Sequence, residues 1–189
     1  MRLDQRKETV FPTQIDGCGI NPDFRVILKI LRVLHDDEMF PLQRQIMALQ
    51  WFFNKPAPAN GAELLWKFIQ GDEEPKDNQN NVTEKPRFDW EFDAPEIYAS
   101  FVSDYRIDLY DMDFLHWRKF LILFQNLSAD SPFKTKIRLR FMDLKGVKGK
   151  QLTETRKAKE SVQIPEKLTW DEMEMLRRYG GEAIWQTVK

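Results

Sequence analysis

His116 is the side chain of this sequence best suited to chemistry at neutral pH. It stands in the run His116-Trp117-Arg118-Lys119, where an imidazole could serve as a general base or as a metal ligand. General base catalysis also needs a nucleophile or a second acid that converges on the imidazole, and no motif supplies one. On a helical wheel begun at Phe114, His116 falls within the apolar arc. The pattern therefore favours a buried, neutral histidine with a hydrogen-bonded partner, and we expect no catalytic residue and no enzyme.

Other candidate ligands for a metal ion are scattered. His35 and His116 lie far apart in the sequence and Cys18 is isolated, so no zinc-binding spacing exists. Four aspartates between residues 104 and 113 suggest a divalent cation, but they lack the EF-hand pattern, and acids before a helix are common caps. The eight glycines form no phosphate-binding loop and no dinucleotide fingerprint. We therefore expect neither a metal nor a cofactor.

The composition indicates a protein with its own apolar core. The chain has 189 residues, 42% apolar side chains, 14 phenylalanines and a formal net charge of −1. A single cysteine excludes an intramolecular disulfide, and no signal segment or membrane-spanning run is visible, so we expect a cytoplasmic protein without a membrane partner. Residues 134–159 hold ten Lys or Arg against two acids. This basic stretch could bind nucleic acid, but a solvated face is the favoured interpretation.

The first half of the chain predicts a short β element followed by helices. Residues 8–20 suggest a hairpin or arm, since Asp-Gly-Cys-Gly tolerates positive φ. A helix should follow with Asn21 as its N-cap and Pro22 at its first position. On this helix the apolar residues form one broad arc, and the opposite side carries Arg25, Lys29 and Arg32.

Further helices are predicted from Pro41 and over residues 60–71. The segment 72–87 is polar and holds a single valine, so we predict a flexible linker there. The predicted domain organisation is therefore a β element with helices over 1–71, the linker over 72–87, a helical part over 88–150 and a basic, helical extension over 151–189.

The second half is also predicted to be helical. Asp93 can cap a helix that carries Ile97, Phe101 and Tyr105, and a helix over 113–127 should follow, capped by Asp111 or Asp113. Residues 131–144 fit both a helix and a strand, and the pair Ser131-Pro132 favours the helix. A last helix should begin at Thr169. The predicted fold class is mainly α, with a short N-terminal β hairpin or arm.

Two sets of residues in the second half have different predicted roles. The structural core should include Tyr98, Phe101, His116, Trp117, Phe120 and Phe124. Apolar residues also occur on the otherwise polar side of the 113–127 helix, and such a helix is covered on several sides, either by this domain or by a partner. The candidate residues for contact with another protein are Leu115, Arg118, Lys119 and Ile122.

Residues 88–144 resemble the bacteriophage gene-product-fifteen family, found in tailed phages and prophages of Gram-positive bacteria. The resemblance rests on the run Asp93-Ala94-x-x-Ile97-Tyr98, the turn at residues 107–109 and the stretch of Leu115, His116, Trp117 and Phe120. The N-terminal motif Asp23-Phe24-Arg25 matches more loosely. The resemblance covers about residues 8–150.

Members of that family are encoded between the major tail protein and the tape-measure protein, the position of tail assembly chaperones. The resemblance thus implies a helical, non-enzymatic protein of the host cytoplasm that keeps the tape-measure protein soluble during tail assembly. It also implies self-association and a possible contact with the major tail protein. The alternative is a structural tail or connector component that stays in the virion.

Overall fold

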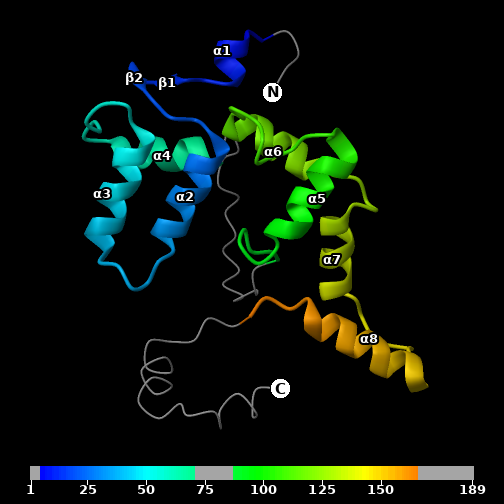
Figure 1. Ribbon diagram of the computed structural model, residues 1–189. Helices are drawn as coiled ribbons and strands as arrows, with labels where there is room; N and C mark the ends of the chain where they lie inside the picture. Colours follow the sequence, from blue (N-terminus) through cyan, green and yellow to red (C-terminus); the bar gives the residue numbers. More distant parts are fainter. Residues whose placement is uncertain (1–4, 71–86, 166–189) are drawn as a thin grey trace. The chain divides into compact units, whose positions relative to one another are not determined.

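The computed structural model describes residues 5–70 and 87–165, which are mainly helical (Figure 1). Its elements in chain order are α1 (Lys7–Val10), β1 (Gln14–Ile15), β2 (Cys18–Gly19), α2 (Phe24–Leu34), α3 (Pro41–Phe52), α4 (Gly61–Gln70), α5 (Ala94–Tyr105), α6 (Trp117–Gln125), α7 (Pro132–Arg140) and α8 (Gly149–Ser161). The mainly α fold class with a short N-terminal hairpin is confirmed. The predicted linker, except Arg87, and the helix predicted from Thr169 lie outside the described residues.

The β element is an antiparallel hairpin of two short strands. Gln14 pairs with Gly19 and Ile15 pairs with Cys18. Asp16 and Gly17 form the turn with φ of 49° and 76°, the positive values that a two-residue hairpin turn of this kind requires. Within the described residues, no helix is both long and apolar enough to span a bilayer.

The chain divides into two compact units, residues 1–138 and 139–189. In the first unit, helices from both sides of the predicted linker bury their apolar faces in one shared core. In the second unit, the end of α8 is held to the end of α7. Arg140 Nε donates to the Val162 carbonyl at 2.7 Å, and Lys159 Nζ donates to the Met142 carbonyl at 2.6 Å.

Two helices begin later than the sequence pattern indicated, for one shared reason. The α2 helix is capped by Asp23 and not by Asn21, and α6 is capped by His116 and not by Asp111 or Asp113. Asp23 and His116 lie opposite each other in extended conformation, and their neighbours bond across this pair: the Phe24 amide donates to the Leu115 carbonyl at 2.9 Å, and the Trp117 amide donates to the Pro22 carbonyl at 2.7 Å. This pairing keeps the residues up to Asp23 and up to His116 out of the helices, which begin at Phe24 and Trp117.

The ambiguous segment after Ser131 is a helix, as the capping pattern predicted. Ser131 Oγ accepts from the Lys134 amide at 3.4 Å, within the first turn of α7. Phe133 is buried and Ile137 packs beside the core. Arg140, three residues after Ile137, is also buried. Spacings of four and three put Phe133, Ile137 and Arg140 on one face of a helix, whereas a strand would direct Arg140 to the opposite face.

Phe120 lies at the centre of the core in the first unit. Its ring stacks with Phe24 at 4.8 Å, with Phe101 at 5.2 Å and with Trp117 at 5.6 Å between centroids. The rings therefore join α2, α5 and α6 through one residue that is 1% exposed. Stacked aromatic pairs add about 0.5–1.5 kcal/mol each beyond the burial of their area.

A buried cation fastens α7 to the start of α5. Lys136 Nζ lies 3.0 Å from Asp93 Oδ1 and 2.8 Å from Glu96 Oε2, and it donates to the Phe92 carbonyl at 3.2 Å. The Asp93 side chain is fully buried, so its charge needs this partner. The Asp93 carboxylate also accepts from the Asp89 amide at 3.0 Å, which orders the chain just before α5.

We expect Trp117→Ala to lower the free energy of unfolding by about 3–5 kcal/mol, the range of core aromatic truncations. Trp117 is 2% exposed and its indole donates to the Ile69 carbonyl at 3.2 Å. The matched control is Trp66→Ala, which should lower the free energy of unfolding clearly less, because Trp66 is 44% exposed. Urea denaturation followed by circular dichroism measures both, and equal losses would contradict this core assignment.

We expect Lys136→Met to lower the free energy of unfolding by about 3–5 kcal/mol, since it removes a cation from beside the fully buried Asp93 carboxylate. Adding Asp93→Asn should recover part of the loss, because the side chain at position 93 is then neutral. Lys145→Met is the control, at a lysine whose ion pair with Asp143 is exposed. The same denaturation series measures all variants; a double variant as unstable as the sum of the single ones would count against the pairing.

Candidate functional site

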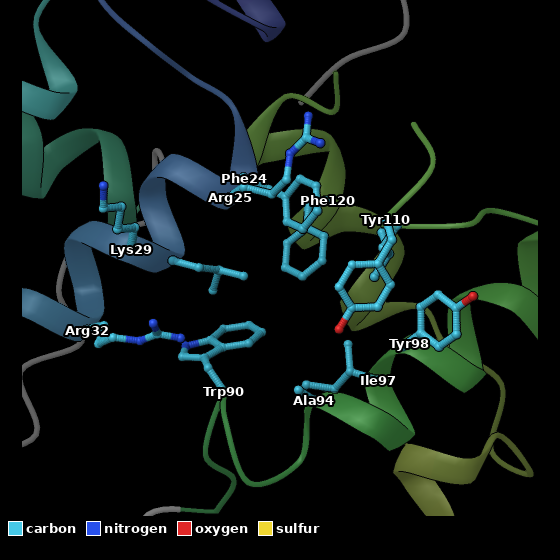
Figure 2. A pocket seen from close by; sticks show the side chains of 12 residues that line it. Phe24, Arg25, Lys29, Arg32, Trp90, Ala94, Ile97, Tyr98, Tyr110 and Phe120 are labelled. Carbon is cyan, nitrogen blue, oxygen red and sulfur yellow. The ribbon is translucent and has the colours of Figure 1, made fainter. Parts of the chain in front are cut away.

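A groove of about 350 Å³ opens in the first unit between α2 and α5 (Figure 2). Figure 2 shows Trp90, Ile97 and Phe120 pointing toward the space between these helices. We call this feature the α2–α5 groove. Its lining residues are Phe24, Arg25, Leu28, Lys29, Arg32, Trp90, Ala94, Ile97, Tyr98, Leu109, Tyr110 and Phe120.

The floor of the groove is the edge of the aromatic core. Phe24 and Phe120 belong to the ring stack, and Ile97 and Leu109 are also buried. Trp90 reaches the groove from the loop before α5 and packs 5.9 Å from the Phe120 ring. The groove therefore lies directly over the buried core, and its apolar floor favours apolar side chains.

One edge of the groove is basic. Arg25, Lys29 and Arg32 follow each other on one face of α2, and no acidic residue is among the twelve that line the groove. Lys29 Nζ lies 3.9 Å above the Trp51 ring, and Arg32 forms an ion pair with Glu91. Because both side chains of that pair are more than half exposed, Arg32 can exchange its partner at little cost.

Two tyrosines, Tyr98 and Tyr110, form the opposite edge. The turn after α5 holds both of them in position. Tyr98 donates its hydroxyl to Asp108 Oδ2 at 3.0 Å, and this bond raises the pKa of Tyr98. Asp108 Oδ1 accepts from the Tyr110 amide at 2.9 Å, so the same carboxylate orders the turn. Amide and hydroxyl donors lower the pKa of Asp108. Tyr110 remains 79% exposed, available to a partner.

Asp23 holds the start of α2 against the segment before α6. Its carboxylate accepts from Nε and from one terminal nitrogen of Arg25, both at 2.9 Å, and the Arg25 guanidinium also donates to the Met112 and Asp113 carbonyls. Burial alone would raise the pKa of Asp23, but the hydrogen bonds and charge of Arg25 outweigh it and lower that pKa. The Asp23–Arg25 pair therefore fixes the end of the groove that Phe24 and Arg25 line.

The hydrogen bonds of His116 define its protonation state. His116 is 5% exposed, its Nε2 lies 3.0 Å from the Pro12 carbonyl, and its Nδ1 accepts from the Arg118 amide at 3.1 Å. A carbonyl can only accept and an amide can only donate, so Nε2 carries the proton and Nδ1 does not. Burial lowers the pKa of His116; the Pro12 bond opposes this and the charge of Arg118 adds to it. The side chain is thus a neutral cap of α6.

The six residues predicted for the core have different environments. Tyr98 is half-buried at the edge of the groove, and the other five are buried: Phe101, His116, Trp117, Phe120 and Phe124.

None of the four residues predicted for protein contact lines the groove. Leu115 is 2% exposed, which corrects its prediction: it precedes α6 in the extended segment that pairs with residues 22–24, so it packs inward. Arg118 and Ile122 are half-buried, and Lys119 is exposed.

The sequence contained one clue to the groove, the shared face of Arg25, Lys29 and Arg32 on α2. Trp90 and Tyr110 lie in loops, and a loop has no residue periodicity from which the direction of its side chains could be predicted. The groove lining contains no histidine, cysteine or carboxylate that could act as a nucleophile or base. Among the described residues, no group of three or more His, Cys, Asp or Glu side chains could hold a metal ion. The arrangement is suited to binding.

We expect His116 to make stability depend on pH below neutrality. Its pKa in the folded chain lies under the ordinary value of about 6.5, so as the pH falls through that value the unfolded chain binds a proton that the folded chain does not. Its contribution to stability is complete above about pH 6.5 and declines as the pH falls toward the folded pKa. His116→Gln keeps one donor and one acceptor and should flatten this slope. Denaturation at pH 7 and pH 5 measures it, with the exposed His35→Gln as control; an unchanged slope in His116→Gln would contradict the assignment.

In the comparison with known protein families, the model of the family described as Bacteriophage Gp15 protein matches residues 13–164. No curated protein and no solved structure matches the chain. The matched segment includes the N-terminal hairpin, all the residues that line the groove and the whole of α8. The chain therefore belongs to the bacteriophage Gp15 protein family.

Proposed function

We propose that this phage protein is a tail assembly chaperone, which binds the tape-measure protein in the host cytoplasm and keeps it soluble until the tail forms. The observation that carries the proposal is the α2–α5 groove, with its apolar floor and basic edge. In this role the protein binds its client without turnover. A contact with the major tail protein would accompany release of the client.

The groove suits one side of an amphipathic helix. Helix-in-groove recognition anchors side chains spaced three or four residues apart, and a cavity of about 350 Å³ has room for such anchors. Long helical proteins with an apolar stripe aggregate when that stripe is exposed. A partner that covers the stripe removes this driving force. The basic edge selects a helix that has acidic residues beside its apolar stripe, because like charges would repel.

The test is co-expression of this protein with a tape-measure protein from the same phage genome. We expect the soluble fraction of the tape-measure protein to rise several-fold and the two proteins to purify together. Arg32→Glu and Tyr110→Ser should each reduce this effect, because they reverse the charge of the basic edge and remove an exposed ring from the opposite edge.

Lys119→Glu is the matched control for these variants. It makes the same charge change on an exposed residue outside the groove, so it should behave like the unchanged protein. Thermal unfolding of each variant verifies that it is folded. A tape-measure protein as insoluble with this protein as without it would overturn the proposal. If Lys119→Glu alone lost the effect, the contact would lie on α6 and not in the groove.

A structural tail or connector component is the alternative function. Mass spectrometry of purified particles separates the two, because a chaperone leaves the assembly and a structural component remains. Copies of this protein in mature virions, in proportion to other tail proteins, would support the alternative.

A further inference from the structure

The first unit carries an exposed apolar surface where the chain turns from α2 to α3. We call this surface the hairpin tip (residues 36–46); it is the end of the α2–α3 helical hairpin and is separate from the N-terminal β hairpin. Phe40 is 75% exposed, Leu42 is 67% exposed and Ile46 is 45% exposed. Leu42 and Ile46 are four residues apart on α3 and therefore share a face. Exposed apolar side chains gathered at one place commonly mark a contact with another protein.

The hairpin tip is acidic where the α2–α5 groove is basic. Asp36, Asp37 and Glu38 come just before Met39 and Phe40, and the side chain of Asp37 is 95% exposed in a long ion pair of 3.4 Å with Arg44. The groove presents three cations and no acid among its lining residues; Arg25 pairs with the buried Asp23 and Arg32 with the exposed Glu91, so Lys29 and Arg32 are the cations open to a new carboxylate. The tip thus combines negative charge with apolar side chains, and the groove combines positive charge with an apolar floor.

The two surfaces do not meet within one molecule. Phe40 is 75% exposed, so the groove of the same chain does not hold it, and neither Phe40 nor its acidic neighbours are among the residues lining that groove. We propose that the hairpin tip of one copy docks into the α2–α5 groove of a second copy. In this contact Phe40 enters the apolar floor, and the acidic residues before it face the cations of α2.

The dimensions agree with such a contact. Lys29 and Arg32 are three residues apart on α2, a distance of about 4.5 Å along the helix axis. The three consecutive acids of the tip lie in a turn, which the Met39 amide closes on the Asp36 carbonyl at 3.3 Å, so they span about 7 Å or less and can face these two cations. Arg32 can leave Glu91 for a carboxylate of the second copy, since the existing pair is exposed on both sides.

The contact is heterologous, because each copy offers its tip to one neighbour and its groove to another. Heterologous contacts produce a ring when the rotation closes and an open chain when it does not. A symmetric dimer through the apolar face of α3 would instead use the same surface twice and leave the groove uninvolved. This difference makes the proposal testable with two variants.

The tip variant is Phe40→Ser with Asp37→Lys, and the groove variant is Tyr110→Ser with Arg32→Glu. Serine is tolerated at position 40 because that residue is the N-cap of α3, a position that favours serine. Sedimentation velocity of the full chain over a range of concentrations measures the assembly state. The unchanged protein and Lys119→Glu should form assemblies that grow with concentration and weaken as salt is raised. Each double variant alone should remain a monomer.

Mixing the two variants is the decisive measurement. The groove variant keeps an intact tip and the tip variant keeps an intact groove, so the mixture should form a dimer of one copy of each and nothing larger. A monomeric unchanged protein at every concentration, or a groove variant that still assembles alone, would overturn the proposal, and so would a mixture that stays monomeric. The same groove serves the proposed function, but this assay uses the protein alone. Its failure would leave the tape-measure proposal standing, and a failed co-expression would leave this contact standing.

Discussion

The fold of the first unit depends on the joint between residues 22–24 and 115–117. Two backbone hydrogen bonds and the Asp23 carboxylate connect segments that are more than ninety residues apart in the sequence, with Asp23 Oδ2 3.5 Å from the Leu115 amide. The joint sets where α2 and α6 begin and brings Phe24 over Phe120. The Asp23–Arg25 pair offsets the cost of burying a carboxylate there by surrounding it with donors.

The groove follows from that joint and from the core beneath it. Once α2 crosses the ring stack, its basic face is directed to one side, while the loops before and after α5 place Trp90 and Tyr110 on the other. The floor itself is core that the chain buries, since Phe24, Ile97, Leu109 and Phe120 are each less than a tenth exposed. The exposed part is the rim, where Tyr110 is 79% exposed, and an exposed ring opposite a row of cations gives a physical reason to regard the groove as a contact surface.

The polar residues that first suggested chemistry have structural roles in this molecule. His116 caps a helix in its neutral form, Asp23 caps another, and Asp108 orders a turn. Asp104 is similar, since it accepts from the Ser128 amide at 2.7 Å. Such residues shape a binding surface indirectly, by fixing where helices start and how loops leave them. Their pKa shifts in the folded chain reflect these bonds and burial.

The sequence by itself determined most of the helical segments and which of their faces are apolar, because those properties depend on spacing within one segment. The helices α3, α4, α5 and α7 begin within a residue or two of their predicted starts for this reason. The sequence did not reveal the short α1, which lies in the predicted β element, and for residues 131–144 it favoured a helix only through a capping pair. Only the tertiary structure decided that α2 starts at Phe24 and α6 at Trp117, since pairing between distant segments outweighed the local caps. It also decided that Leu115 is buried and that a groove exists, because burial and cavities depend on residues that no local pattern connects.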